Sequence, residues 1–246
     1  MTLFLDALNW IFDPANNVGD GSIPSRLLEH LVFTLVTILM ASALAVPLGF
    51  LIGHTGRGRG LAVAVSGGLR ALPTLGLLTL VALWVGIGLE APYVALTVLA
   101  IPPVLAGAYT GFEAIDRTTI DAARSVGMSE WQIVRKVEIP LGLPLLIGGL
   151  RSGTLQVVAT ATLAAYVADF GLGRFLFTGL KTRDYAEMLG GSILVILLAL
   201  ALEGIFSVID RVVLPRGVAA GHPTEVRARS ARPRPGMEST IAEGRN

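Results

Sequence analysis

Three charged residues, Arg70, Arg151 and Glu203, lie within long apolar stretches of this 246-residue chain. A charged side chain inside a membrane is energetically costly, and it generally pairs with an opposite charge or serves a function. Each of the three lies about nine residues from the end of its stretch that is predicted below to be cytoplasmic, on the order of 14 Å along a helix. They can therefore meet at one depth, and we expect a structural Arg–Glu pair. The alternative is that they line a path through the protein or tune its opening.

The remaining candidates for chemistry do not form the pattern of an enzyme or a metal site. The chain has no cysteine, which excludes disulfides, thiolate metal ligands and cysteine nucleophiles. None of its histidines has metal-ligand spacing: His30, His54 and His222. The other acids within or beside apolar stretches, Glu29 and Asp210, stand alone or near an end. We therefore predict no catalytic residue and no bound metal or cofactor.

The segment GRFLFTGLKT, Gly173–Thr182, has the glycines and lysine of a phosphate-binding loop but not its spacing. That loop requires GxxxxGK followed by Ser or Thr, whereas here five residues separate the glycines and Leu180 precedes Lys181. Any ATP hydrolysis linked to this protein is accordingly expected on a separate chain.

The elements that position these residues are membrane helices. The chain is 53% hydrophobic and 15% charged, with a mean hydropathy of +0.69, whereas soluble domains carry roughly a quarter charged residues. Since a helix needs about 20 apolar residues to cross a bilayer, we predict an all-α integral membrane protein. The candidate spans are Leu27–Gly53, Leu61–Gly88, Pro92–Phe112, Leu141–Thr162 and Met188–Val212. The second contains Gly67, Gly68 and Pro73, and a split there would give six segments instead of five.

The positions of Lys and Arg predict the orientation, because basic residues concentrate in cytoplasmic loops. With the N-terminus outside, the inside segments hold Arg57, Arg59, Arg117, Arg124, Arg135, Lys136 and the tail from Arg211 onward. The outside segments hold only Arg26, Arg174, Lys181 and Arg183. We therefore predict an N-out, C-in topology.

This topology divides the chain into three parts. Residues 1–26 are predicted as an extracytoplasmic segment, in which Phe4, Trp10 and Phe12 suggest a short amphipathic segment at the membrane interface, with a flexible terminus as the equal alternative. Residues 27–212 form the transmembrane domain, with a cytoplasmic loop at 113–140. Residues 213–246 are rich in Pro, Arg, Gly and Ala and are predicted as a disordered basic cytoplasmic tail.

The loop contains DAARSVGMSEWQIVRKVEIPLGLP, residues 121–144, which reads as two short helices with a corner at Gly127. Ser129 and Gln132 have the spacing of a capping box, and Thr118 with Asp121 has a weaker one. Pro140 is expected to end the second helix. Ala122 and Ala123 offer a flat surface, and Met128 and Trp131 are apolar types that favour interfaces. These features fit a rigid projection for a cytoplasmic partner or, equally, an amphipathic helix on the lipid headgroups.

The same stretch resembles the coupling-loop signature of ABC importer permeases: Glu-Ala-Ala, three residues, Gly, nine residues, Ile-x-Leu-Pro. The matching residues are Asp121-Ala122-Ala123, Gly127 and Val137-Glu138-Ile139-Pro140. All spacings agree, with Asp for Glu, Val for Ile and Ile for Leu. The resemblance implies the transmembrane domain of a type I ABC importer, in which this loop receives a cytoplasmic ATPase subunit.

Three further stretches, at 69–88, 94–116 and 160–180, resemble permeases of osmoprotectant importers for glycine betaine, choline, carnitine or proline. The resemblance covers roughly residues 27–212. It implies a multi-pass protein of the bacterial cytoplasmic membrane that forms a homodimer or heterodimer with a second permease chain. It also implies ATP bound by the ATPase partner, an extracytoplasmic solute-binding protein and no nucleic-acid partner. The alternatives are a permease for methionine or another amino acid, a stand-alone secondary transporter, or an intramembrane enzyme.

Two other patterns are candidates for the moving parts of such a transporter. YVADFGLGRF, Tyr166–Phe175, suits a re-entrant turn on the outer side. A gate or a docking site for the binding protein there would use Tyr166, Asp169, Phe170, Gly171 and Gly173, and the alternative is an ordinary loop. Glycines spaced by four within spans predict close helix packing, with a sliding surface as the alternative: Gly49/Gly53, Gly107/Gly111 and Gly149/Gly153.

Overall fold

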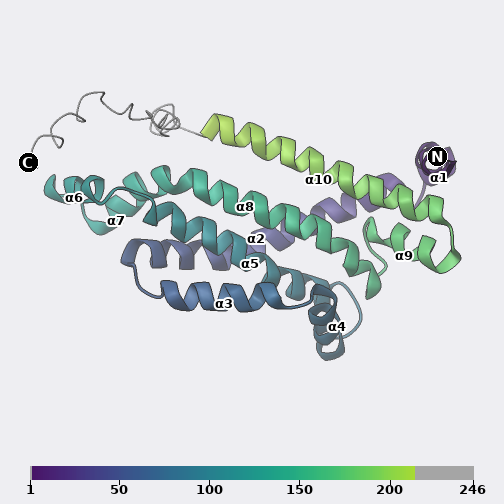
Figure 1. The fold of residues 1–246 in the computed structure, drawn as a ribbon, viewed down its shortest axis with the longest axis horizontal. Coiled ribbons are helices and arrows are strands. Elements are labelled where there is room, and N and C mark those ends of the chain that lie inside the picture. The colour runs from purple at the N-terminus through teal and green to yellow at the C-terminus, as the bar shows by residue number, and fades with distance from the viewer. Residues whose placement is uncertain (1, 214–246) are drawn as a thin grey trace, which may run out of the picture. The chain divides into compact units, whose positions relative to one another are not determined.

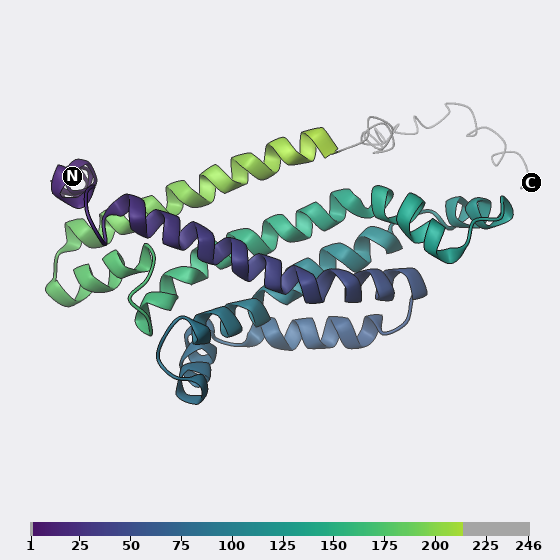
Figure 2. The same ribbon diagram turned by 180° about the vertical axis from the view of Figure 1, so that it is seen from behind.

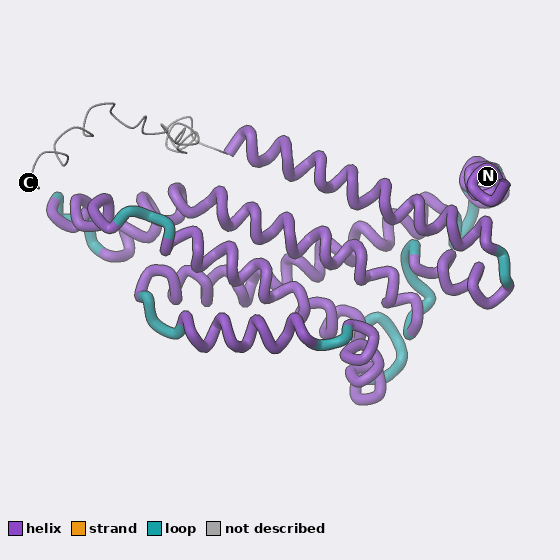
Figure 3. The backbone as a smooth tube through the Cα atoms, viewed as in Figure 1, coloured by secondary structure: helices purple, strands orange, loops and turns teal. Residues whose placement is uncertain are grey.

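The computed structural model describes residues 2–213, and these fold entirely into helices and connecting turns (Figures 1 and 3). Helices are the expected outcome because a segment inside lipid must satisfy its backbone hydrogen bonds internally. The α-helices are α1 (Thr2–Phe12), α2 (Ile23–Thr55), α3 (Arg59–Ala71), α4 (Thr74–Val85), α5 (Glu90–Glu113), α6 (Arg117–Ser125), α7 (Glu130–Ile133), α8 (Ile139–Ala161), α9 (Gly173–Thr182) and α10 (Tyr185–Val213). Short 3-10 helices occupy Pro14–Asn16 and Thr162–Tyr166, and a π-helical turn, Val134–Glu138, joins α7 to α8.

Helix α5 lies between α2 and α8 and forms the centre of the bundle. Glycines permit both contacts: a Cβ added to Gly107 would lie 2.7 Å from the Cα of Gly149, and one added to Gly49 would lie 2.4 Å from the Cβ of Ala108. The predicted close packing of the glycine pairs is therefore confirmed. Gly142 of α8 also lies in the contact between α5 and α8, because a Cβ added to Gly111 would lie 2.6 Å from the carbonyl oxygen of Gly142.

Three of the predicted spans correspond to helices long and apolar enough to cross a membrane: α2, α5 and α10. The second predicted span is broken. Its halves, α3 and α4, meet at an angle of 89°, and the break falls at Leu72 and Pro73, where proline has no N–H for the helix. Helix α8 has the length of the fourth predicted span, but prolines and Arg151 make it less apolar. The count of five spans therefore stays a prediction.

The two ends of the bundle carry different elements (Figures 1 and 2). Helices α6 and α7, the α2–α3 turn and the C-terminal end of α10 lie at one end, and α1, α4 and α9 lie at the other. The loops predicted to be cytoplasmic thus share one end. The orientation of that end in a membrane stays a prediction.

The N-terminal segment forms a helix, α1, that packs against α10. Ala7 is buried, the Trp10 ring lies 5.0 Å from that of Phe175, and a Cβ on Gly190 would meet the Trp10 ring at 2.5 Å. Of the two alternatives the structure shows an ordered helix, and its position at the membrane interface stays a prediction. The predicted basic tail lies outside the described residues apart from its first position, Val213.

Candidate functional site

The α6–α7 hairpin, residues 116–138, contains the stretch that the sequence singled out. Helix α6 begins after Asp116, whose Oδ1 accepts a hydrogen bond from the backbone N–H of Thr118 at 2.9 Å. That bond lowers the pKa of the Asp116 carboxyl below its ordinary value. The predicted capping box at Thr118 and Asp121 is therefore wrong, because the helix is capped two residues earlier by the Asp116 carboxylate, which accepts from the Thr118 N–H. Asp121 is accordingly the fifth residue of α6.

The corner at Gly127 has the predicted left-handed backbone, with φ of +85°. The Gly127 N–H donates to Arg124 O at 2.9 Å, and the Met128 N–H donates to Ala123 O at 3.2 Å. These two bonds form a Schellman motif, which ends α6 and turns the chain. Ser129 then starts α7 with the predicted capping box: its Oγ accepts from Gln132 N, and its own N–H donates to Gln132 Oε1 at 2.9 Å.

The predicted helix end at Pro140 is wrong. After α7 the chain continues through the π-helical turn into α8 without leaving helical geometry. Pro140 stands at the start of α8, directly after the wider π turn. A proline nitrogen has no hydrogen to donate, and in the first turn of a helix this loses no hydrogen bond.

The hairpin has a small apolar core of its own. Ile120, Ala123 and Ile133 are buried in it, and Ile115, Met128 and Val137 pack against them. Ala123 and Met128 therefore face inward and are not available as a docking surface. Ala122, Val126 and Trp131 face outward, with Val126 78% and Trp131 71% exposed. A rigid corner with an exposed tryptophan is the arrangement expected of a surface that contacts another molecule.

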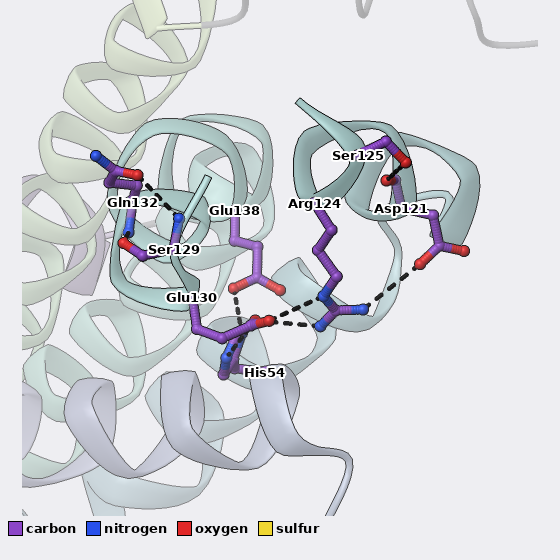
Figure 4. A network of polar contacts seen from close by, with 8 residues as sticks. All are labelled: His54, Asp121, Arg124, Ser125, Ser129, Glu130, Gln132 and Glu138. Atoms are coloured by element: carbon purple, nitrogen blue, oxygen red, sulfur yellow. Dashed lines mark hydrogen bonds and ion pairs between the residues drawn. The ribbon is translucent and has the colours of Figure 1, made fainter. Parts of the chain in front are cut away.

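Charged side chains join the hairpin to the end of α2 (Figure 4). Arg124 donates twice to the Glu130 carboxylate, at 2.9 and 3.1 Å, and its Nη1 lies 3.5 Å from Asp121 Oδ1. These hydrogen bonds raise the pKa of Arg124 and lower that of Glu130. Glu130 Oε2 lies 3.4 Å from His54 Nε2, and His54 Nδ1 lies 2.7 Å from Glu138 Oε2. His54 is the last-but-one residue of α2.

Sequence reasoning missed the contact between His54 and Glu138. The residues are 84 positions apart. His54 lies at a helix end and Glu138 at the variable position of the coupling-loop signature, so neither position suggests a distant partner. A buried glutamate between Val137 and Ile139 was the only available signal.

The intramembrane charges form the predicted pair and include a third residue. Arg151 of α8 forms a salt bridge with Glu203 of α10, with Nε 2.8 Å from Oε2. Its Nη1 also lies 3.2 Å from Asp210 Oδ2, seven residues, or about two helical turns, further along α10. Arg70 does not join them: it is exposed at the end of α3, and it has no ion pair within residues 2–213.

The predicted outer-gate residues lie beside the start of α2. Asp169 Oδ1 is 2.8 Å from Arg26 Nη2 and 3.2 Å from Arg174 Nε, and the Gly171 N–H donates to Glu29 Oε2 at 2.9 Å. Gly171 has φ of +62°, a conformation that glycine adopts without strain.

The aromatic residues of this loop differ in exposure. The Phe170 ring lies 5.4 Å from that of Phe33 on α2, whereas Tyr166 is 56% exposed, with its ring 5.9 Å from that of Phe177. Gly173 allows a close approach, because a Cβ there would meet the carbonyl oxygen of Thr162. The structure thus brings Asp169, Phe170 and Gly171 onto α2, and leaves Tyr166 facing outward.

Comparison with known proteins identifies the kind of molecule that carries this site. The glycine betaine/carnitine/choline transport system permease protein OpuCB of Bacillus subtilis is 30% identical over 198 residues, 80% of this chain and 91% of the relative. The carnitine transport permease protein OpuCB of Listeria monocytogenes is 31% identical, covering 77% of this chain and 87% of the relative. The osmoprotectant import permease protein OsmW of Salmonella typhimurium is 28% identical, covering 87% of this chain and all of the relative.

Solved structures agree on the fold. A chain of the methionine ABC transporter MetNI in an inward-facing conformation matches with a TM-score of 0.69 and 25% identity, over 78% of this chain and 96% of that one. A chain of an amino acid ABC transporter matches with a TM-score of 0.62. The all-α fold is therefore that of a type I ABC importer permease. Residues 45–217, which include the α6–α7 hairpin, match the family described as binding-protein-dependent transport system inner membrane component. The chain belongs to this family: it is a multi-pass inner-membrane permease subunit of an ABC transporter, which works with a separate ATPase and a substrate-binding protein.

Proposed function

We propose that this permease imports an osmoprotectant such as glycine betaine, choline, carnitine or proline. The observation that carries the proposal is the set of relatives with osmoprotectant names, which this chain matches over nearly their whole length. The structural neighbours that carry methionine or other amino acids support the alternative solute, but at 25% identity or less they chiefly reflect a shared fold. A stand-alone transporter and an intramembrane enzyme gain no support from any of these likenesses.

In this proposal the α6–α7 hairpin is the coupling loop on which the cytoplasmic ATPase docks. Its support is the exposed face formed by Asp121, Ala122, Val126 and Trp131 on a corner held rigid by the Schellman motif and the capping box. Closure of the ATPase on ATP would displace the hairpin and bias the bundle between two packed arrangements. ATP is bound by the partner, and this chain contributes no residue to its hydrolysis.

The second permease chain is proposed to contact α4. Large apolar side chains face outward at its C-terminal end, with Leu83 90% and Trp84 88% exposed, and Ile87, two residues beyond the helix, is 88% exposed. Apolar surface of this extent marks either a lipid-facing surface or a contact with another chain. The bend between α3 and α4 turns α4 away from the direction of a spanning helix, which favours the contact with a second chain, identical or different.

The loop at Tyr166–Gly173 is proposed as the outer gate and the neighbourhood in which the binding protein docks. Its support is the polar connection between Asp169 and the basic residues Arg26 and Arg174, which ties the loop to the start of α2. A movement of α2 would therefore displace this loop through the contact between Arg26 and Asp169.

Reconstitution tests the proposed solute. The permease is purified with its partner ATPase and substrate-binding protein, placed in liposomes containing ATP, and supplied with radiolabelled glycine betaine, choline, carnitine, proline or methionine. We expect ATP-dependent uptake of at least one osmoprotectant and none of methionine. Uptake of methionine alone would replace the proposed solute, and the absence of ATP-dependent uptake of all five would refute the proposed function.

A further inference from the structure

Glu138 is a buried acid with a single polar contact. Its side chain is 3% exposed, and within residues 2–213 its carboxylate has one hydrogen-bond partner, His54 Nδ1 at 2.7 Å. A buried carboxylate without a partner is strongly unfavourable. The free energy of the hairpin in this arrangement therefore depends on keeping His54 in place.

The contact bridges two elements that are otherwise joined by little. Glu138 ends the π-helical turn between α7 and α8, and single π turns are frequently found at functional sites. The apolar core of the hairpin contains no residue of α2. A groove of about 500 Å³ instead separates the two, lined by Phe50 and His54 of α2, Trp131 of α7 and Ile139 of α8, among others.

Polar contacts thus form a continuous chain from α6 to α2. Arg124 of α6 holds Glu130 of α7, Glu130 lies next to His54, and His54 holds Glu138 (Figure 4). Beyond His54 the end of α2 is fixed firmly to α5: the rings of Phe50 and Phe112 stack at 4.5 Å, and a Cβ on Gly53 would lie 2.7 Å from the Cβ of Phe112. A displacement of the hairpin that reaches His54 is therefore passed to α2 and α5 together.

We propose that His54, through its hydrogen bond to Glu138, is the positioning residue that transmits movement of the α6–α7 hairpin to α2. The inference rests on the proposed function, because it assigns a route for the force that an ATPase would apply to the hairpin. It adds a residue outside the coupling loop, on the first spanning helix, to the machinery that links ATP hydrolysis to transport.

Three substitutions of His54 separate its two contacts. His54→Asn places an amide nitrogen near the position of Nδ1 and keeps a donor for Glu138. His54→Gln places its amide near the position of Nε2, toward Glu130, and leaves Glu138 without a donor. His54→Ala removes both contacts. For each variant, uptake of the solute that the wild-type complex transports is measured per ATP hydrolysed in proteoliposomes. The yield of assembled complex is measured as well.

We expect His54→Asn to keep the wild-type ratio of uptake to hydrolysis. His54→Gln and His54→Ala should lower the ratio about tenfold, the effect expected from losing a hydrogen bond to a charged group, while ATP hydrolysis continues. If Ala leaves Glu138 too unfavourable for folding, the double variant His54→Ala/Glu138→Ala removes the buried charge and should fold but remain uncoupled. Glu138→Gln still accepts a hydrogen bond from His54 and should keep the ratio.

The control is Arg59→Ala, which removes the 3.5 Å ion pair with Glu113 at the same end of the bundle without touching the hairpin. It should leave the ratio unchanged. The inference would be overturned if all His54 variants had equal ratios of uptake to hydrolysis. It would also be overturned if His54→Gln kept the ratio while His54→Asn lowered it, or if Arg59→Ala lowered the ratio as well. Because the wild-type complex is measured first, failure of the proposed solute appears as absent uptake before any variant is compared.

Discussion

At the scale of single residues, the α6–α7 hairpin is held both by contacts between neighbours in the chain and by contacts between distant segments. The capping box at Ser129 and the positive φ of Gly127 depend on neighbours a few positions away, so the sequence predicts both. The burial of Ala123 and Met128 depends on Ile133 folding back onto α6, which no local pattern indicates. The Glu138–His54 hydrogen bond depends on two segments 84 residues apart, and for that reason sequence reasoning missed it.

Gly127 allows a test of the hairpin corner alone. A Cβ there would have no neighbour within 4 Å, so a substitution strains only the backbone. Gly127→Val should destabilise the hairpin by about 1–2 kcal/mol because a β-branched residue disfavours positive φ. We expect normal membrane insertion, weaker capture of the ATPase in a pull-down and reduced uptake. Gly127→Asn, a residue that tolerates this conformation, is the control and should behave nearly as wild type. Normal capture and uptake by the valine variant would argue against the coupling-loop assignment.

Arg151 is predicted to matter more than either of its acidic partners. Arg151→Leu leaves both Glu203 and Asp210 without their cation, whereas Glu203→Leu leaves Arg151 paired with Asp210. We expect Arg151→Leu to lower the free energy of unfolding by at least about 1–3 kcal/mol, the cost of an unsatisfied buried polar group and a lower bound for a charged one, and Glu203→Leu to lower it less. Thermal unfolding in detergent measures both.

The double variant Arg151→Leu/Glu203→Leu tests the pairing itself. It should recover part of the loss, because deleting a pair costs less than breaking it. The recovery should be incomplete, since Asp210 stays unpaired. A double variant as harmful as the sum of the two single variants would show that Arg151 and Glu203 are independent and would favour a role in the solute path.

At the scale of elements, helices that cross the bundle with continuous apolar sequence were predicted well. The bounds of α2, α5 and α10 lie within four residues of the predicted spans. A break at Pro73 was weighed, whereas the helix end predicted at Pro140 was wrong, because the effect of a proline depends on the turn before it. Pro73 separates two helices at a sharp angle, whereas Pro140 follows a π turn and interrupts nothing. A π turn has no sequence pattern strong enough to predict it.

The contact between α5 and α8 gives a prediction with a closely matched control. Gly107→Ala places a Cβ 2.7 Å from both the Cα of Gly149 and the carbonyl oxygen of Leu145, so the two backbones must separate. Overpacking of this kind costs about 1–3 kcal/mol. Gly148→Ala introduces the same methyl group one position from Gly149, where nothing lies within 4 Å.

We expect a lower melting temperature for Gly107→Ala and an unchanged or slightly higher one for Gly148→Ala, because alanine favours helix over glycine. Melting of the purified protein in detergent provides the measurement. Equal melting temperatures for the two variants would show that the helices are farther apart than the structure places them.

At the scale of the whole molecule, the predicted membrane orientation is open to a direct test, because the chain has no cysteine. Val126 at the hairpin corner and Val18 near the N-terminus are each 78% exposed. In intact cells, Val18→Cys should react with an impermeant thiol reagent, and Val126→Cys should react only after the cells are opened. The opposite pattern would invert the topology, and equal labelling of both sites would show that the two ends are not on opposite sides.

The glycine contacts on both sides of α5 also limit how this protein can move. Where two backbones touch, a small rotation of either helix replaces a hydrogen atom with a side chain and drives it into its neighbour's main chain. Gly107 against Gly149 is a contact of this kind, and Gly49 lies equally close to the Ala108 methyl group. We therefore expect α2 and α8 to keep their positions against α5 at these contacts when the α6–α7 hairpin moves. The movement that alternating access requires would then come from the elements around these three helices.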